Sequence, residues 1–483
     1  MRRSVLPVLA ALMVVTAAPA SAATSSTVKW VSCPEDVVAG AAPHQPACGT
    51  VQVPLDYSKP DGTQIELMIS KLASPNPGKR RGVLLLNPGG PGGSGMTLST
   101  LLMTKGLPGG VTDGYDLIGM DTRGVGHSTP MSCGFPADGP YYANIPPYAV
   151  DDAAVGKQAK IAKGVADLCA KNDPDGRLRH LTTANTARDL DRIRAALGEE
   201  KASYLGYSYG TALGAAYASM FPERADRVVL DSNIGDTFLD HDGMRRYALG
   251  TEQAFPDFAK WAAARHDAYG LGRTPEEVRR TYFEIAGRLD KNPVDGADGG
   301  MFRLITFGGL FGETAYARTA QAWQSMLRPG PAAPPKATGV SPADNSLTVF
   351  LSVTCNDIEW PEDVGTYRRA VAEDRERYPL YGAAAANITP CAYWSHEPAE
   401  PPVAINDDGP RNVLIVQNRR DAPTPLRGGQ MLREKFEDRS RLLTVDGGGH
   451  GVYVLGGNPC ALNVTTKYLA EGVMPARDEF CGK

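Results

Sequence analysis

The 483-residue sequence has little of what would tie a protein to a membrane or to nucleic acid. After residue 23 it contains no long apolar run, so it predicts no membrane-spanning helix in the mature chain. The formal net charge of −4 gives no electrostatic reason to expect binding to nucleic acid or to an anionic membrane. A C-x-x-C motif, a histidine-rich spacing, an internal repeat and a coiled-coil pattern are also lacking. We therefore expect a globular monomer with no metal site.

The N-terminal residues have the features of a secretory signal peptide. Arg2 and Arg3 precede an apolar run over 5–18, and residues 20–22 (Ala-Ser-Ala) supply the small residues of a cleavage site. The apolar run is too short and too rich in alanine to form a transmembrane anchor. No cysteine lies at the expected cleavage point after Ala22, which argues against a lipid anchor. We therefore predict a secreted, extracellular protein.

Eight cysteines in an exported chain favour four disulfides, because secretory compartments are oxidising. Pairing of sequence neighbours is the simplest of the possible connectivities, and buried free thiols are the alternative. Each closed loop would stabilise the fold by about 3–4 kcal/mol in the chain-entropy model. The predicted pairs are Cys33 with Cys48, Cys133 with Cys169, Cys355 with Cys391, and Cys460 with Cys481.

Short apolar segments alternate with helical spacing over much of the chain. Strands are predicted at 83–86, early in 115–128 and in 202–210, and at 227–232, with helices at 183–197 and 211–221. A strand at 412–418, a helix at 426–436 and a strand at 441–450 continue the pattern near the C-terminus. Such alternation is typical of a parallel α/β sheet. We predict a doubly wound, mostly parallel sheet.

The pattern changes to mainly helical in the middle of the chain. Helices are predicted there at 255–269, 275–288 and 315–327. The economical interpretation is a helical lid inserted into the sheet domain. The predicted parts are the signal peptide at 1–22, the core at 23–235, the lid at 236–405 and the C-terminal part of the core at 406–483.

A candidate nucleophile lies in Gly206-Tyr-Ser-Tyr-Gly210, which matches G-x-S-x-G. This motif forms a sharp strand-to-helix turn that exposes the serine hydroxyl, and small flanking residues let the strand and helix approach closely. Strand-like residues precede the motif and a small-residue helix follows it, which makes the match more specific. We predict that Ser208 is a nucleophile; a structural turn serine is the alternative.

A serine of ordinary pKa needs a base, and the base needs an acid that orients it. The chain order expected with this motif is serine, acid, histidine. His450 follows the last predicted strand in a Gly-Gly-Gly-His sequence that can present its ring, so we predict it as the base. His396 in the lid is the weaker rival, and a structural loop histidine is the alternative.

The predicted acid is Asp421, which lies just beyond the strand at 412–418. A carboxylate there can reach a histidine that follows the next strand, hold its tautomer and stabilise the imidazolium. Asp231 and Asp446 are rivals, and a solvated loop aspartate is the alternative.

The glycine-rich stretch at 82–95 permits two interpretations. Gly90-Pro-Gly-Gly-Ser-Gly95 satisfies G-x-G-x-x-G, a dinucleotide fingerprint, with Asp113 and Asp116 near the distance of a ribose-binding acid. However, Pro91 removes an N–H donor that a phosphate would need, and an exported chain has no cytoplasmic dinucleotide. We favour an oxyanion hole made by the backbone N–H groups of Gly90 and Tyr209, and we expect no cofactor.

Together these motifs resemble a known family. The segments NPGGPGGSG, DTRGVGHS, GYSYG, DAPTP and GGGHG are similar to successive blocks of the secreted tripeptidyl aminopeptidases of high-GC bacteria. These are α/β-hydrolase serine peptidases related to prolyl aminopeptidases. The resemblance implies an α/β-hydrolase fold, a Ser208, Asp421, His450 triad and release of tripeptides from free N-termini. Pro88 stands where simple prolyl aminopeptidases often have a histidine, a departure that concerns specificity.

An aminopeptidase has to recognise the α-ammonium group of its substrate, and a buried cation needs a paired anion. The segment 354–363 offers Asp357 and Glu359 beside Trp360, and we predict amine recognition by one of these two carboxylates. A solvated acidic loop is the alternative.

The sequence therefore predicts a secreted serine exopeptidase that acts on peptide or protein N-termini through an acyl-enzyme. An esterase or other small-molecule hydrolase with the same triad is the runner-up. A hydrolase-fold binding protein without activity is the third possibility.

Overall fold

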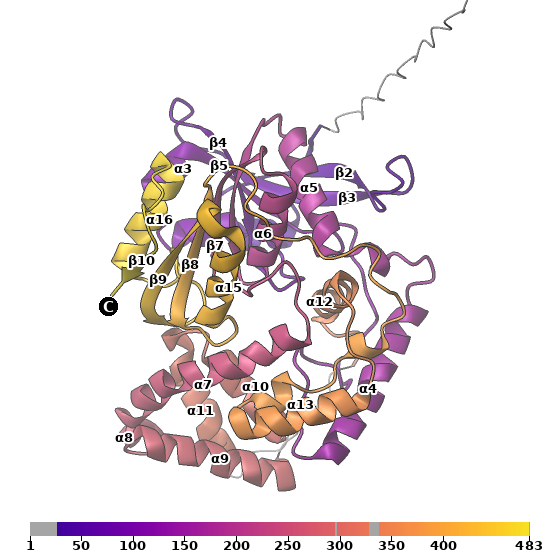
Figure 1. Ribbon diagram of the computed structural model, residues 1–483, viewed down its shortest axis with the longest axis vertical. Coiled ribbons are helices and arrows are strands. Elements are labelled where there is room, and N and C mark those ends of the chain that lie inside the picture. The colour runs from indigo at the N-terminus through magenta and orange to yellow at the C-terminus, as the bar shows by residue number, and fades with distance from the viewer. Residues whose placement is uncertain (1–26, 295–296, 328–337, 483) are drawn as a thin grey trace, which may run out of the picture.

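A computed structural model of the chain describes residues 27–294, 297–327 and 338–482 (Figure 1). The predicted signal peptide at 1–22 lies outside the described residues. In this part of the chain, no helix is long and apolar enough to cross a membrane.

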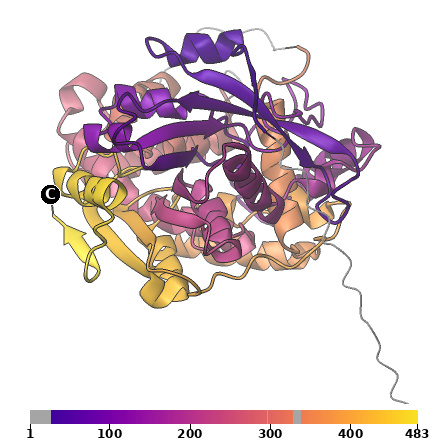
Figure 2. The same ribbon diagram turned by 90° about the horizontal axis from the view of Figure 1, so that it is seen from above.

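Ten strands of the described residues form one mixed sheet, in the order β1-β2-β3-β5-β4-β6-β7-β8-β9-β10. The pairs β1–β2, β2–β3 and β3–β5 are antiparallel, and the other neighbours are parallel. Seen from above, the indigo N-terminal strands and the yellow C-terminal strands lie at opposite edges (Figure 2). The strands are β1 (Lys29–Val31), β2 (Ala47–Pro54), β3 (Gln64–Leu72), β4 (Gly82–Asn87), β5 (Tyr115–Met120), β6 (Ala202–Tyr207), β7 (Ala225–Asp231), β8 (Val413–Arg420), β9 (Ser440–Gly448) and β10 (Glu479–Cys481).

The central parallel strands are buried on both faces, which is why they are continuously apolar. Alternate residues of β4 belong to two separate cores: Val83 and Leu85 to one, Leu84 and Leu86 to the other. The helices packed on these two faces are α5 (Thr183–Ala196), α6 (Gly210–Met220) and α15 (Leu426–Phe436) on the first, and α2 (Leu98–Thr104), α3 (Gly109–Gly114) and α16 (Pro459–Glu471) on the second; α1 (Glu35–Ala41) packs with β2 near the sheet edge. The doubly wound, mostly parallel sheet is confirmed.

A helical insertion separates β7 from β8 and lies below the sheet in Figure 1. The helices predicted at 275–288 and 315–327 are present with small shifts of their ends. The helix predicted at 255–269 has different bounds. The helix begins at His241, capped by Asp240, and ends at Ala263 before a short helix closes at Gly270. Pro256 lies inside this helix without ending it. The insertion helices are α7 (His241–Ala263), α8 (His266–Tyr269), α9 (Pro275–Lys291), α10 (Gly299–Gly309), α11 (Glu313–Leu327), α12 (Asp344–Asp357), α13 (Val364–Arg377) and α14 (Gly382–Ala385).

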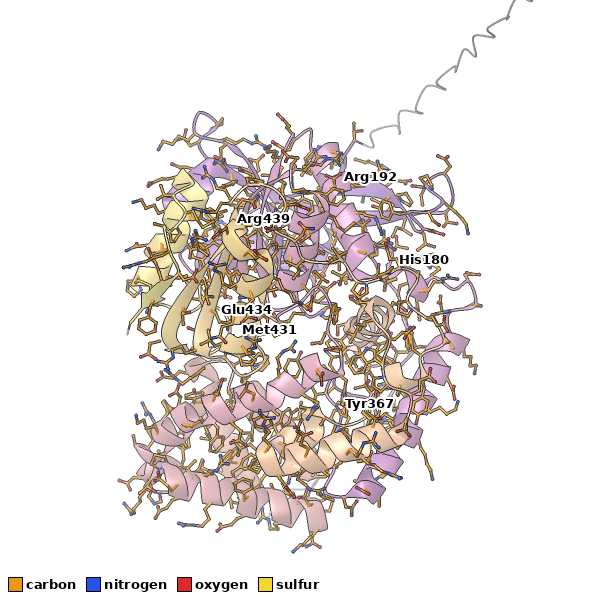
Figure 3. All side chains as sticks on the ribbon, viewed as in Figure 1. His180, Arg192, Tyr367, Met431, Glu434 and Arg439 are labelled. Carbon is orange, nitrogen blue, oxygen red and sulfur yellow. A yellow bond between two sulfur atoms is a disulfide. The ribbon has the colours of Figure 1, made fainter. Side chains whose placement is uncertain are left out.

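A helix from outside the insertion also packs with it. Helix α4 (Asp152–Lys171) lies between β5 and β6 in the chain, yet its Val155 and Ala159 share a core with Tyr367 and Val371 of α13. Tyr367 is labelled at this contact in Figure 3. The layer that faces the sheet is therefore built from two separate segments of the chain.

All eight cysteines lie within the described residues and form disulfides between sequence neighbours. The bonds are Cys33–Cys48, Cys133–Cys169, Cys355–Cys391 and Cys460–Cys481. The third of these fixes the C-terminal end of α12 to the segment around residue 391.

Candidate active site

Ser208 lies in a tight turn between β6 and α6. Its φ of +58° is in the left-handed region, as a strained strand-to-helix turn requires. A β-carbon at Gly206 would collide with Gly210 O, and one at Gly210 would lie 2.9 Å from Asn87 O. The two glycines of the motif thus allow the turn to close and α6 to pack against β4.

Asp421 and His450 form a hydrogen-bonded pair at the ends of β8 and β9. The His450 Nδ1 atom lies 3.0 and 3.1 Å from the two carboxylate oxygens of Asp421. Asp421 is fully buried, and its Oδ1 also accepts from the Thr424 N–H at 3.0 Å. The carboxylate is therefore fixed on both sides and points at one ring nitrogen, which leaves Nε2 as the nitrogen for chemistry.

Thr424 is a contact that the sequence interpretation missed. Its hydroxyl lies 3.2 Å from His450 Nδ1, so it adds a second polar neighbour to that edge of the ring. The only local signal was the Asp-x-x-Thr spacing, in which the Asp421 side chain accepts from a backbone N–H three residues later.

The charge around His450 favours its protonated form. Burial lowers the pKa of the imidazole, but the charge and hydrogen bond of Asp421 and the charge of Asp231 outweigh it and raise the pKa above the usual 6.5. An imidazolium would therefore be stabilised here, as a general base needs once it has taken a proton.

The rival acids have other partners. The Asp231 carboxylate accepts from the N–H groups of Tyr453 (2.7 Å) and Val452 (3.0 Å) and from the Ser232 hydroxyl. Burial raises the pKa of Asp231 to about 7 against these hydrogen bonds. Asp446 forms ion pairs with Arg420 and Arg419. Of the three carboxylates, Asp421 is the one hydrogen-bonded to the His450 ring within the described residues.

Asp231 also connects the turn of Ser208 to the loop of His450. Its backbone oxygen accepts from the Ser208 N–H at 3.0 Å, while its carboxylate binds the backbone just after His450. The Tyr207 hydroxyl donates to Tyr453 O at 2.9 Å, which ties the same two segments.

Within the described residues no hydrogen bond joins the Ser208 hydroxyl to the His450 ring. Such bonds often tighten only when substrate is bound.

The glycine-rich loop lies against the turn of Ser208. A β-carbon at Gly89 would lie 2.8 Å from Ser208 Cβ and 3.0 Å from Tyr209 N, so only glycine fits there. The Gly89 N–H donates to Asn87 Oδ1 at 2.9 Å. Among the described residues, the N–H groups of Gly90 and Tyr209 have no hydrogen-bond acceptor. The two donors lie in segments that contact each other: Tyr209 follows Ser208, and Gly90 follows Gly89, which packs against both. Unpaired donors of this kind are what an oxyanion site requires.

The acids of the dinucleotide interpretation lie elsewhere. Asp116, near the N-terminal end of β5, binds Lys71 and Arg80, and Asp113 pairs with Lys79. Because β4 and β5 are parallel, this end of the sheet is opposite the glycine-rich loop that follows β4. Both carboxylates therefore form ion pairs at the end of the sheet that is opposite the glycine-rich loop.

The predicted substrate residues have different surroundings. The Asp357 carboxylate is buried and accepts from the N–H and hydroxyl of Thr183 at 2.7 and 2.5 Å. Glu359 is exposed, and with the largely buried Trp360 it lines an open pocket beside the Cys355–Cys391 disulfide. Other residues lining this pocket are Glu362, Trp394, His396 and Glu397.

The insertion contacts the backbone of the Asp421 and His450 loops. A β-carbon at Gly250 of α7 would collide with Ala422 O and lie 2.7 Å from Asp421 O. The Phe311 carbonyl, between α10 and α11, accepts from the His450 N–H at 2.8 Å. The Phe311 ring lies 5.4 Å from the imidazole, measured between ring centroids.

Comparisons with known proteins bear on the whole chain. A family model described as the alpha/beta hydrolase fold matches residues 82–456. A tripeptidyl aminopeptidase of Streptomyces coelicolor is 36% identical, over 96% of this chain and 87% of its own. The serine protease Hip1 of Mycobacterium tuberculosis is 29% identical, over 94% of this chain and 91% of its own. A carboxylesterase B of Mycobacterium tuberculosis is also 29% identical, over 94% of this chain and 89% of its own.

Proposed function

The chain belongs to the alpha/beta hydrolase fold family, and on that premise we propose that it is a secreted serine exopeptidase that releases short peptides, above all tripeptides, from free N-termini. The observation that carries the proposal is the hydrogen bond between the buried Asp421 and the partly exposed His450, tied through Asp231 to the turn that presents Ser208. The similarity to a tripeptidyl aminopeptidase over 96% of the chain supports the choice of substrate.

In the proposed reaction Ser208 Oγ attacks the carbonyl carbon of the scissile peptide bond, and His450 Nε2 takes the hydroxyl proton. Asp421 holds the ring and stabilises the imidazolium. The N–H groups of Gly90 and Tyr209 donate to the tetrahedral oxyanion. When the C–N bond breaks, His450 returns the proton to the leaving amine. A water molecule then attacks the acyl carbon while His450 Nε2 takes one of its protons. His450 gives this proton to Ser208 Oγ as the ester C–O bond breaks, which releases the peptide acid.

Glu359 is the better of the two candidates for recognising the substrate ammonium group. It is exposed in an acidic pocket whose wall includes Trp360, so it has room for a cation and an aromatic neighbour. Both oxygens of Asp357 already accept hydrogen bonds from Thr183. The proposal of a secreted enzyme rests on the N-terminal sequence and is supported by the four disulfides, which are typical of oxidising compartments.

The second candidate is an esterase that uses the same three residues, favoured by the similarity to a carboxylesterase B. Tripeptide nitroanilides with a free and with an acetylated N-terminus separate the two. The exopeptidase is expected to lose most of its kcat/KM on acetylation, and Glu359→Gln should weaken the preference for the free amine. Equal rates on both substrates would contradict the exopeptidase and leave the esterase.

A further inference from the structure

A buried chain of hydrogen bonds runs from the helical insertion to the residue after Ser208. Asp357 is the last residue of α12, and its Oδ2 accepts from the Thr183 hydroxyl at 2.5 Å. The same hydroxyl oxygen lies 2.7 Å from the Tyr209 hydroxyl. All three side chains are buried, with exposed fractions of 7%, 2% and 5% in the order named.

The direction of this chain follows from its donors. A threonine hydroxyl has one hydrogen to donate, and here it goes to the Asp357 carboxylate. The Tyr209 phenol therefore donates to Thr183 Oγ1, and burial keeps that phenol neutral by raising its pKa. By accepting the Thr183 hydrogen, the Asp357 carboxylate thus fixes the orientation of the Tyr209 hydroxyl two hydrogen bonds away.

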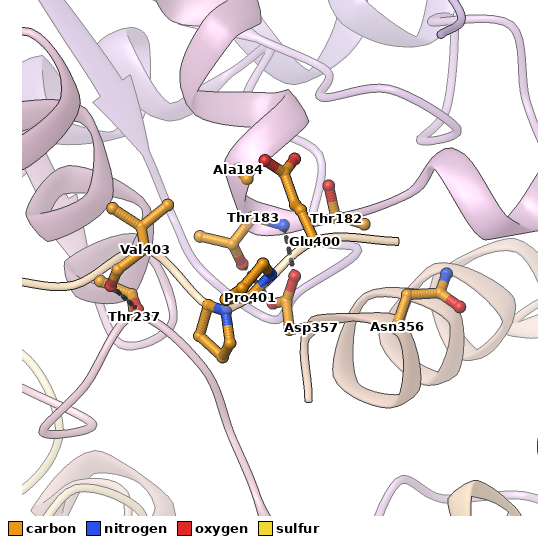
Figure 4. Close-up of a pocket in the computed structure, with 10 residues that line it drawn as sticks. Thr182, Thr183, Ala184, Thr237, Asn356, Asp357, Glu400, Pro401 and Val403 are labelled. Atoms are coloured by element: carbon orange, nitrogen blue, oxygen red, sulfur yellow. Dashed lines mark hydrogen bonds between the residues drawn. The ribbon is translucent and has the colours of Figure 1, made fainter. Parts of the chain in front are cut away.

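No ion pair balances the Asp357 charge in the part of the chain that the structure describes. Burial and, to a lesser extent, the charge of Glu400 raise the pKa of Asp357 to about 7. Glu400 lies in the same pocket (Figure 4) and is itself held by Arg188 at 2.6 Å. Two donors from Thr183 hold the carboxylate, one of them an N–H in the first turn of α5 (Figure 4). Burying a carboxylate without a cation is costly, so its position calls for a reason beyond packing.

We propose that Asp357 is a positioning residue for catalysis. Through Thr183 it fixes the Tyr209 ring, and with it the backbone N–H that follows Ser208 in the turn. The insertion thereby holds one of the two oxyanion donors, although that donor belongs to the sheet core. This inference rests on the proposed function, because it takes the Tyr209 N–H as an oxyanion donor.

Steady-state kinetics of Asp357→Asn, Tyr209→Phe and the double variant test the inference. We expect each single variant to lower kcat by about 10-fold with KM nearly unchanged, since the oxyanion forms only in the transition state. The double variant should be no slower than the slower single variant, because both substitutions break the same chain. Thr183→Val is the substitute test if Asp357→Asn folds poorly. It keeps the N–H bond to Asp357 but removes the hydroxyl that links Asp357 to Tyr209, so it should show the same loss of kcat.

Asp344 provides a matched control at the other end of α12. It is also a buried aspartate, and its Oδ1 accepts from the Phe135 N–H at 2.7 Å rather than from Thr183. Asp344→Asn should lower the midpoint of thermal unfolding and leave kcat unchanged. Equal losses of kcat in Asp344→Asn and Asp357→Asn would overturn the inference, as would wild-type kcat in Asp357→Asn or additive effects in the double variant. Full activity of Ser208→Ala would instead refute the proposed function.

Discussion

The sheet core and the helical insertion serve the candidate site in different ways. Ser208, Asp421 and His450 each follow a parallel strand of the core, so the topology of the sheet brings them to one edge. The insertion contacts the backbone of the Asp421 and His450 loops, through Gly250 of α7 and the Phe311 carbonyl. The core therefore supplies the three candidate side chains, while the insertion packs against the loops of two of them.

The largest expected effect distinguishes two buried carboxylates of the core. Asp421→Asn should lower kcat by about 10⁴-fold, because the amide no longer stabilises the imidazolium or fixes its tautomer. Asp231→Asn should reduce kcat far less, since Asp231 binds backbone N–H groups rather than the His450 ring. Steady-state kinetics of the two purified variants measure this contrast. A larger loss in Asp231→Asn would identify Asp231 as the acid.

A smaller effect is expected from the contact between the insertion and the Asp421 loop. Gly250→Ala should push α7 away from Ala422 O, cost about 1–3 kcal/mol of unfolding free energy and lower kcat by displacing Asp421. Gly287→Ala in α9 is the matched control, because a β-carbon there meets no atom within 4 Å. It should stabilise the protein by about 0.5–1 kcal/mol and leave kcat unchanged. Urea unfolding and kinetics on both variants test the contrast; wild-type kcat in Gly250→Ala would mean that the insertion does not position the acid.

The smallest expected effect is on pH dependence. The neutral form of His450 is the base, so kcat/KM should fall as the pH drops through a pKa above 6.5. Removing the Asp231 charge lowers the pKa of His450, so Asp231→Asn should move this acidic limb to lower pH by a fraction of a unit. If the acidic limb of the Asp231→Asn profile lies at the same pH as that of the wild type, the Asp231 charge does not affect the pKa of His450.

Stability gives a second readout of Asp231. Its pKa is about 7 in the folded protein and 3.8 as the reference, so the folded state binds the extra proton between these values. The stability that Asp231 contributes is therefore present below pH 3.8 and is lost as the pH rises through about 7. Relative to Asp231→Asn, the urea midpoint of the wild type should fall over this range.

The core was largely predictable because its signals are local. Fully buried strands such as 83–86 read as continuous apolar segments, and the glycines at 206 and 210 mark the turn of Ser208 without reference to distant residues. The similarity of the chain to a tripeptidyl aminopeptidase, inferred from five short motifs, is confirmed. The sequence predicted Asp421 as the acid but left Asp231 as a rival, because each lies at or just after the end of a strand. Their separate partners depend on which loop each carboxylate faces.

The contributions of the insertion were not predictable for a related reason. Asp357 and Thr183 are 174 positions apart, and no local pattern links them. The packing of α4 on α13 and the hydrogen bond from His450 to the Phe311 carbonyl likewise join distant segments. Packing between distant segments decides these contacts, whereas spacing within one motif decides the turn of Ser208.

Covalent labelling tests most directly whether Ser208 is the nucleophile. A fluorophosphonate reacts with an activated serine hydroxyl, and digestion followed by mass spectrometry locates the adduct. We expect one adduct, on Ser208, that forms more slowly in Asp421→Asn and is absent in Ser208→Ala. An adduct on another residue, or no adduct on the folded wild-type protein, would contradict the assignment of Ser208 as the nucleophile.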